Sequence, residues 1–339
     1  MKIDITERVF HFRQPAGTSR GVYTERRSWF VEVSDGERRI ENRRLWGKAN
    51  VGECAPLPDL SCDARPDYAE VLRGFCDEVE RTGEIPYEAM RSYPSMLFGL
   101  EMATTHHPSL IIHSSYSIPI NGLVWMGTLD EMYARVKEKL DAGFRCVKLK
   151  IGAIDWQQEM ELIRFVRQHF STEQVELRVD ANGGFSVEDA PRRLEELAKY
   201  DIHSIEQPIR QGHWVAMSRL CGMTPLPIAL DEELIGVNTR EEKVRLLDII
   251  RPQYLVLKPS LHGGIRGTTE WVALARERGI GTWLTSALES NIGLYAIAQL
   301  AICLYGSHIT FPQGLGTGQL FTDNIPMPIE IKGDKLWVM

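Results

Sequence analysis

Six charged residues of this chain lie at the ends of five successive strand-like runs. They are Lys148 and Lys150 in CVKLKIG, Asp180 in ELRVDAN, Glu206 in HSIEQP, Asp231 in PIALDE and Lys258 in YLVLKPS. From Lys150 onward, neighbouring members of the set are separated by 30, 26, 25 and 27 residues. That interval is about the length of one strand–loop–helix–loop unit of a parallel barrel. The carboxyl ends of all strands in such a barrel open on one face, so we expect the six side chains to converge there.

From about residue 115 onward, candidate strands alternate with helix-like runs. The candidate strands are SIPING, CVKLKIG, ELRVDAN, SIEQP, PIALDE, YLVLKPS, GTWLTSA and HITFPQG. This alternation predicts right-handed βαβ units and a parallel sheet. Eight strands favour a closed barrel over a doubly wound open sheet, because open sheets usually have fewer strands. The predicted fold class is therefore α/β, with a TIM-type (β/α) barrel over residues 109–322.

Residues 1–108 have a different pattern, in which strands come first and helices follow. The strand-like runs are KIDITERVFHF, YTERRSWFVEVSD and RRLWGKANVGECAPL, with a turn at SDGE. The helical patterns are PDYAEVLRGFCDEVERTG and SMLFGLEMATTHH. Strands followed by helices predict an α+β domain. The tail IEIKGDKLWVM is typical of a strand pair, and we expect residues 323–339 to complete the N-terminal domain.

Charge and cysteine usage narrow the class of protein. The formal net charge of −7 argues against partners such as nucleic acids or anionic membranes. The six cysteines are dispersed and form no C-x-x-C pair, which fits a reducing cytosol. The start of the chain lacks the apolar segment of a secretory signal, and the apolar stretch Ile292 to Tyr305 is too short to span a bilayer. We expect a cytoplasmic enzyme with a small-molecule substrate, and the sequence leaves assembly into a homo-oligomer open.

The three acids of the set predict a metal site. Asp180, Glu206 and Asp231 each follow an apolar run and precede a turn. Ionised carboxylates that lie close together repel one another, and a divalent cation removes this repulsion. Ligands that are all oxygen atoms indicate Mg²⁺, with Mn²⁺ as the alternative ion, rather than Zn²⁺. A separate role for each acid, as a helix cap or ion-pair partner, is disfavoured because all three occur at the same point of the repeat.

The lysines of the set predict an acid–base function. Side chains two apart on a strand point to the same face, so Lys148 and Lys150 both point into the barrel mouth. Buried lysines are rare unless they are paired or functional. A neighbouring cation and a metal would lower their pKa and make a base that works near neutral pH. Lys258 ends a strand on the far side of the barrel and would bracket the same ligand. The alternative is that these lysines simply extend from the strand ends into solvent.

Other residues are weaker candidates for substrate contacts. Arg178 lies two residues before Asp180, so it faces the interior and pairs either with an acid of the barrel or with a substrate carboxylate. Gly314 and Gly316 belong to GLGTGQ, whose backbone N–H groups could hold a carboxylate at the barrel mouth. A dinucleotide-binding function is disfavoured for that loop because no Rossmann-type helix follows it. Ser286 ends the seventh candidate strand and could serve the same purpose.

The motifs K-x-K, D-A-N, I-E-Q-P, D-E and L-K-P occur here in an order and spacing that resemble the enolase superfamily, in its muconate-lactonizing-enzyme subgroup. The resemblance covers nearly the whole chain. It implies a modified barrel under an N-terminal α+β capping domain, with Mg²⁺ on the three acids. It also implies that Lys150 removes a proton α to a carboxylate, while Lys258 stabilises the resulting charge from the opposite face and Lys148 assists.

Softer motifs narrow the implied reaction. They are GECAPLPDLS, IALDEEL, LES and GLGTGQLFTDN. Within the subgroup they make the chain most similar to carbon–oxygen lyases of menaquinone biosynthesis. This resemblance implies syn dehydration of 2-succinyl-6-hydroxy-2,4-cyclohexadiene-1-carboxylate to 2-succinylbenzoate. A dipeptide epimerase or N-acylamino-acid racemase is the alternative, although the segment TFPQGLG lacks the D-x-D typical of dipeptide epimerases. A barrel that has kept only a binding function is disfavoured, because all six charged positions are present.

Overall fold

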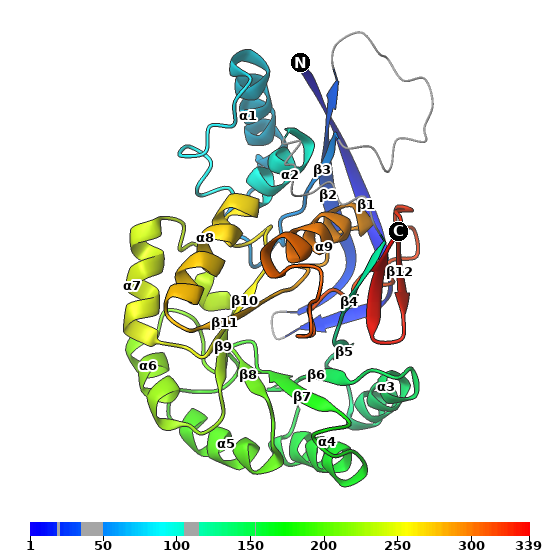
Figure 1. The fold of residues 1–339 in the computed structure, drawn as a ribbon, viewed down its shortest axis with the longest axis vertical. Helices are drawn as coiled ribbons and strands as arrows, with labels where there is room; N and C mark the ends of the chain where they lie inside the picture. The colour runs from blue at the N-terminus through cyan, green and yellow to red at the C-terminus, as the bar shows by residue number, and fades with distance from the viewer. Residues whose placement is uncertain (19–20, 35–49, 105–114, 153) are drawn as a thin grey trace.

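The N-terminal part of the computed structural model is an antiparallel sheet packed on two helices (Figure 1). The structure describes residues 1–18, 21–34, 50–104, 115–152 and 154–339. The sheet has the order β1 (Lys2–Thr18), β2 (Gly21–Ser34) and β3 (Val51–Cys54), and the helices are α1 (Tyr68–Thr82) and α2 (Pro94–Thr104). The predicted α+β pattern is therefore confirmed, while the turn predicted at SDGE extends beyond the described residues.

The two helices of this part differ in how they are buried. Helix α1 buries one stripe, formed by Tyr68, Leu72, Cys76 and Val79 at helical spacing, and ends at Gly83 with a left-handed φ of 78°. Helix α2 is buried almost all round. It contacts β3 on one side and α8 (Gly264–Glu277) of the barrel on another. The sheet and the barrel are thus joined through the apolar surface of α2.

The rest of the chain forms a curled parallel sheet surrounded by helices (Figure 1). In sheet order from one edge to the other, the strands are β11 (Gly281–Leu284), β10 (Tyr254–Leu257), β9 (Ile228–Leu230), β8 (Ser204–Glu206), β7 (Glu176–Asp180), β6 (Cys146–Lys150) and β5 (Gly122–Val124). The helices are α3 (Leu129–Asp141), α4 (Trp156–His169), α5 (Ala190–Leu197), α6 (Trp214–Met223), α7 (Arg240–Ile250), α8 (Gly264–Glu277) and α9 (Asn291–Tyr305). The predicted α/β barrel with an N-terminal α+β region is confirmed.

Two of the eight predicted strands differ from expectation. The run SIPING divides between β4 (Tyr116–Pro119), which pairs outside the barrel, and β5, which joins the parallel sheet. The run HITFPQG forms no strand. Its residues Gln313 and Gly314 instead make single parallel bridges to Ile120 and Thr285. Backbone hydrogen bonds from this segment to both sides close the circle between β11 and the start of β5. The eighth position is therefore filled by an extended segment too short to count as a strand.

The C-terminal tail forms the predicted strand pair, β12 (Ile329–Lys332) and β13 (Lys335–Val338). Strand β13 pairs with β4 and not with the N-terminal sheet. Contact with that sheet comes from just before the hairpin, where Phe321 bridges Phe12 and Asp323 accepts a hydrogen bond from the His11 backbone. The division into residues 1–108 with 323–339 and residues 109–322 remains our proposal.

The apolar stretch Ile292 to Tyr305 forms most of α9, whose first ten residues are largely buried in the core. None of the helices in the described ranges is long and apolar enough to cross a membrane.

Candidate active site

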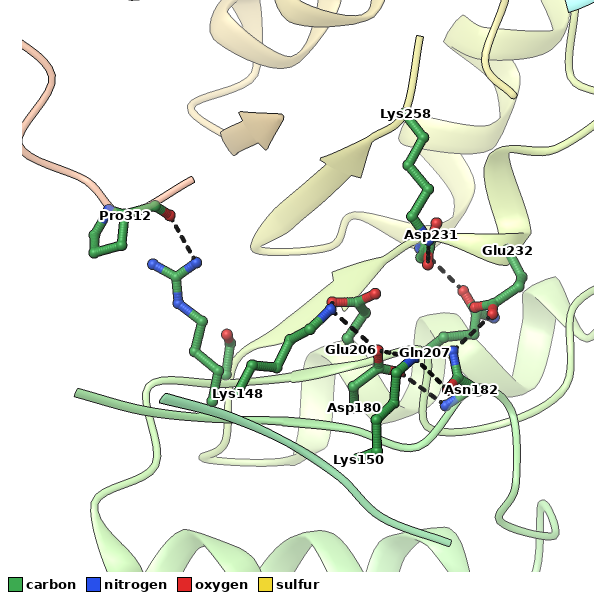
Figure 2. A network of polar contacts seen from close by, with 12 residues as sticks. Lys148, Lys150, Asp180, Asn182, Glu206, Gln207, Asp231, Glu232, Lys258 and Pro312 are labelled. Carbon is green, nitrogen blue, oxygen red and sulfur yellow. Dashed lines mark hydrogen bonds and ion pairs between the residues drawn. The ribbon is translucent and has the colours of Figure 1, made fainter. Parts of the chain in front are cut away.

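The six charged residues converge at the carboxyl ends of neighbouring strands, as the spacing predicted (Figure 2). The register aligns Lys150 with Asp180 and Asp180 with Glu206 across β6, β7 and β8. Lys148 Nζ lies 3.1 Å from Asp180 Oδ2 and 2.8 Å from Glu206 Oε2. Lys150 Nζ lies 2.7 Å from the same Asp180 oxygen. On the other side of the site, Lys258 Nζ pairs with Asp231 Oδ2.

The three carboxylates are shielded from water. Asp180, Glu206 and Asp231 are at most 2% exposed. Glu206 Oε1 and Asp231 Oδ1 are buried, and no partner in the described part of the chain hydrogen-bonds to them. Buried carboxylate oxygens are costly to leave unpaired, so these two atoms are suited to accept an added cation.

As placed, however, the acids hold ammonium groups rather than an arrangement ready for a metal. Among the described residues, no group of three His, Cys, Asp or Glu side chains has the spacing of a closed metal site. Lys148 bridges Asp180 and Glu206, and Lys258 takes one oxygen of Asp231. The donors are chemically right for Mg²⁺, but the lysine side chains must give way for all three acids to share one ion.

Burial and charge separate the pKa values of the acids. Burial, followed by the negative charge of Asp180, raises the pKa of Glu206 to about 8. Burial alone would also raise the pKa of Asp180, but the ammonium groups of Lys150 and Lys148 outweigh it and hold that pKa below its usual range. Desolvation raises the pKa of Asp231 despite the nearby Lys258. Two of the three carboxyls therefore gain from an additional positive charge.

The expected lowering of the pKa is wrong for Lys148. Burial would lower the pKa of Lys148, yet the charges of Glu206 and Asp180 raise it above its usual range. The pKa of Lys258 is raised in the same way, chiefly by Asp231. Each ammonium is held by carboxylates rather than facing another cation. The prediction applies to a site with a metal bound. A metal on the acids would offset part of the carboxylate charge that raises these lysine pKa values.

A pocket opens from the lysines toward the N-terminal part of the chain. Lys148, Lys150, Lys258 and Glu232 form its charged lining. Its apolar lining consists of Tyr23, Leu57, Leu60, Leu123, Trp125, Ala287 and Leu288. Tyr23, Leu57 and Leu60 come from the N-terminal part of the chain. The pocket is therefore built jointly by the barrel mouth and the capping region.

Comparison with known proteins decides the family. The family model described as Enolase C-terminal domain-like matches residues 131–333, which is more than half of the chain. The chain belongs to the enolase superfamily. It is 43% identical to o-succinylbenzoate synthase from Desulfotalea psychrophila, over 96% of both chains. The solved structure of MenC from the same organism has a TM-score of 0.79 and 37% identity, and the match covers 100% of this chain and 99% of that one.

More distant members share the fold. Dipeptide epimerase from Enterococcus faecalis, solved with Mg and a dipeptide, has a TM-score of 0.82 at 16% identity, with 100% of this chain and 96% of that one covered. At that identity the match supports a common architecture only. The predicted resemblance to the enolase superfamily is thus confirmed, and the barrel-mouth location of the charged residues is the one expected for it.

The predicted glycine and serine positions lie in the pocket, but the available hydroxyls belong to other residues. Ser286, Gly314 and Gly316 all line it. The Ser286 hydroxyl is already used, because it donates to Glu289 Oε2 at 2.6 Å and accepts from the Leu288 N–H at 3.1 Å. The sequence argument missed two threonines, Thr285 and Thr317, which also line the pocket. Their hydroxyls are buried and, within the described ranges, without a hydrogen-bond partner. In the sequence, only the patterns TSA and GTG pointed to these two threonines.

Arg178 does not line the pocket, and of the two partners expected for it the structure shows an acid of the barrel, Glu176. Its guanidinium donates to Glu176 Oε1 at 2.6 Å and to the Pro312 carbonyl at 3.0 Å. The same group lies over the rings of Trp283 and Phe311, at 4.6 and 4.5 Å from their centres. These contacts form a paired layer inside the barrel, so the first of the two alternatives holds. The physical reason is that Glu176, on the same strand, and the rings of Trp283 and Phe311 hold the guanidinium away from the pocket.

Gly314 is needed for space beside Thr285, which gives a prediction for this member of the superfamily. A Cβ at Gly314 would overlap the Thr285 hydroxyl. We expect Gly314→Ala to raise KM roughly tenfold, since overpacking of a filled site costs about 1–3 kcal/mol. Steady-state kinetics measures this. Gly222→Ala is the matched control, because a Cβ there meets nothing within 4 Å. Equal KM values for the two variants would contradict the assignment of Gly314 to the substrate pocket.

Proposed function

We propose that this protein is an o-succinylbenzoate synthase. It dehydrates 2-succinyl-6-hydroxy-2,4-cyclohexadiene-1-carboxylate to 2-succinylbenzoate, as a carbon–oxygen lyase of menaquinone biosynthesis. The observation that carries the proposal is the 43% identity to the Desulfotalea psychrophila o-succinylbenzoate synthase over nearly the full length of both chains. The lysine and carboxylate cluster supports it, because proton removal next to a carboxylate needs a base and concentrated positive charge.

Asp180, Glu206 and Asp231 are the residues that would hold Mg²⁺, with Mn²⁺ as the alternative. Their all-oxygen donor set and the two unpaired buried oxygens of Glu206 and Asp231 support this assignment. A bound ion would supply positive charge beside the substrate carboxylate and offset the negative charge that develops there. Treatment with EDTA is therefore expected to lower kcat at least roughly 100-fold, with recovery on adding Mg²⁺. Full activity in metal-free buffer would contradict this assignment.

The lysines carry the proton chemistry. Lys150 Nζ, in its neutral form, takes the proton from C1 of the substrate. The bond between C6 and the hydroxyl oxygen breaks on the same face, and the proton and hydroxide leave together as water. The ring electrons that remain complete the aromatic system. Lys258, which pairs with Asp231 across the site, stabilises the charge that forms before the hydroxide leaves, and Lys148 supports the carboxylate.

The pocket lining supports a substrate with a ring and a second polar group. Tyr23, Leu57 and Trp125 provide apolar surface for a ring. The unpaired hydroxyls of Thr285 and Thr317 can donate hydrogen bonds to a second carboxylate. A substrate of this kind has a ring for the apolar surface and a carboxylate for the two threonine hydroxyls.

A dipeptide epimerase or N-acylamino-acid racemase is the second candidate. The observation in its favour is that Lys150 and Lys258 both line the pocket, as a pair of opposed proton donors and acceptors would. Against the epimerase, Glu232 is the one carboxylate among the described residues that line the pocket. Its position beside Asp231 leaves the Gly314–Thr317 side without an acid to hold a dipeptide α-ammonium.

A comparison of substrates separates the two candidates. The values of kcat/KM would be measured for dehydration of the cyclohexadiene carboxylate and for racemisation of an N-succinylamino acid, followed by deuterium exchange. The proposal predicts that dehydration has the larger value. A larger value for racemisation or epimerisation would reverse the assignment while leaving the superfamily unchanged.

A further inference from the structure

The amide of Asn182 lies between Lys150 and the carboxylate of Glu232 (Figure 2). Lys150 Nζ donates to Asn182 Oδ1 at 2.6 Å, and Asn182 Nδ2 donates to Glu232 Oε1 at 2.9 Å. All three residues line the pocket. Asn182 and Glu232 follow the ends of different strands, so the amide links the end of β7 to the turn after β9.

The chemistry of these groups fixes the direction of the chain of hydrogen bonds. An ionised carboxylate can only accept, so the Asn182 NH₂ group must face Glu232. The amide oxygen is thereby turned toward Lys150, whose ammonium can only donate. Glu232 and Lys150 thus favour the same orientation of the amide, and replacing the carboxylate by a neutral group weakens the hydrogen bond that holds its NH₂ end.

Both ends of this link are held by buried neighbours. The Asn182 N–H donates to Asp180 Oδ1 at 3.0 Å, with the backbone in the left-handed region at a φ of 44°. Glu232 is 3% exposed. Gln207 Oε1 accepts from the backbone N–H groups of Asp231 and Glu233, at 3.2 Å each, on either side of Glu232. The turn that carries Glu232 is therefore anchored independently of Lys150.

We propose that Glu232 and Asn182 are positioning residues for Lys150, which hold its Nζ against the site through one directed amide. This inference rests on the proposed function, in which Lys150 is the base. A lysine side chain has four rotatable bonds, and Asp180 alone leaves its terminal group free to turn about that contact. A second contact from Asn182 limits that movement and keeps Nζ where the substrate proton will lie.

The test is Glu232→Gln, which keeps the size of the side chain and adds a donor. Crystal structures of the variant and the wild type would be compared at Lys150. We expect the hydrogen bond from Asn182 Nδ2 to residue 232 to lengthen and Lys150 Nζ to move by about 1 Å, with kcat lowered roughly ten- to a hundredfold. KM should stay within about twofold, because a general loss of the pocket would raise it instead. Asn182 and Lys150 unmoved, or an unchanged kcat, would overturn the inference.

Two further variants keep the result specific. Glu233→Gln is the matched control, since Glu233 is equally buried but bonds Gln207 and the Gly212 N–H and does not line the pocket. It should leave the contact between Lys150 and Asn182 in place. In an Asn182→Ala background, Glu232→Gln should lower kcat no further, because the link is already broken. Additive losses would contradict the link.

The failure of this inference can be distinguished from failure of the proposed function. Wild-type protein that does not turn over the cyclohexadiene carboxylate would reject the proposed function, while the crystal structures still decide the link. If the wild type turns over the substrate and Glu232→Gln has the same kcat, only the link from Glu232 through Asn182 to Lys150 is rejected. If Glu232→Gln fails to fold, the position of Lys150 in the Asn182→Ala crystal structure decides the question, and an unmoved ammonium contradicts the proposal.

Discussion

Replacing Lys150 with alanine is expected to lower kcat by roughly 10³-fold, because the group that removes the proton is lost. Lys150 is 8% exposed and its ammonium lies 2.7 Å from Asp180 Oδ2, so water cannot readily take its place. The measurement is steady-state dehydration of the cyclohexadiene carboxylate, with thermal unfolding to verify the fold. The change also leaves Asp180 with one ammonium partner fewer. The variant and the wild type should therefore both be assayed with saturating Mg²⁺.

Lys137→Ala is the control for this change. Lys137 is exposed on α3, so its removal should leave kcat within about twofold. Lys150→Ala with near-normal kcat would show that another group removes the proton and would reject its assignment as the base.

Replacing Glu53 with alanine is expected to lower the free energy of unfolding by about 4 kcal/mol. Glu53 is fully buried on β3, and its Oε1 accepts from the Ser28 hydroxyl and the Ser290 N–H at 2.8 and 2.9 Å. Its Oε2 accepts from the Ser290 hydroxyl and the Gly293 N–H at 2.6 and 2.9 Å. Removing the carboxylate leaves four buried donors without an acceptor, each at a cost of about 1–3 kcal/mol before relaxation.

Urea unfolding monitored by circular dichroism measures this loss. Glu25→Ala is a matched control, because Glu25 is an exposed glutamate on the neighbouring strand β2 and should change stability by less than about 0.5 kcal/mol. Since Glu53 joins the N-terminal sheet to the start of α9, the variant should also lose activity at temperatures where the barrel remains folded. Equal stability of the two variants would contradict this role.

Glu53 also illustrates what the sequence could not predict. Its partner Ser290 lies 237 residues further along the chain, and no local pattern connects the two. By contrast, the positions of Lys148 and Lys150 follow from strand alternation, which is a local property. The three acids each occur at the end of a strand in the βα repeat, and this common position predicted that they lie at the barrel mouth. Local periodicity was therefore enough for the charged lining of the pocket, but not for the contacts that join its two halves.

The errors have the same origin. HITFPQG has the composition of a strand, but its backbone makes only single bridges to Ile120 and Thr285. Strand β4 looks like part of the barrel, yet it pairs with β13 from the end of the chain. Arg178 has the alternation of a site residue, but its guanidinium is held away from the pocket by Trp283 and Phe311. In each case a partner distant in sequence decides the outcome.

The most direct test of the proposed function is an ultraviolet assay of the purified protein with 2-succinyl-6-hydroxy-2,4-cyclohexadiene-1-carboxylate. The initial rate of 2-succinylbenzoate formation would be recorded with saturating Mg²⁺ and again after EDTA treatment. We predict rapid formation of the aromatic product that depends on Mg²⁺. Absence of product from folded, Mg²⁺-binding protein would contradict the assignment as an o-succinylbenzoate synthase.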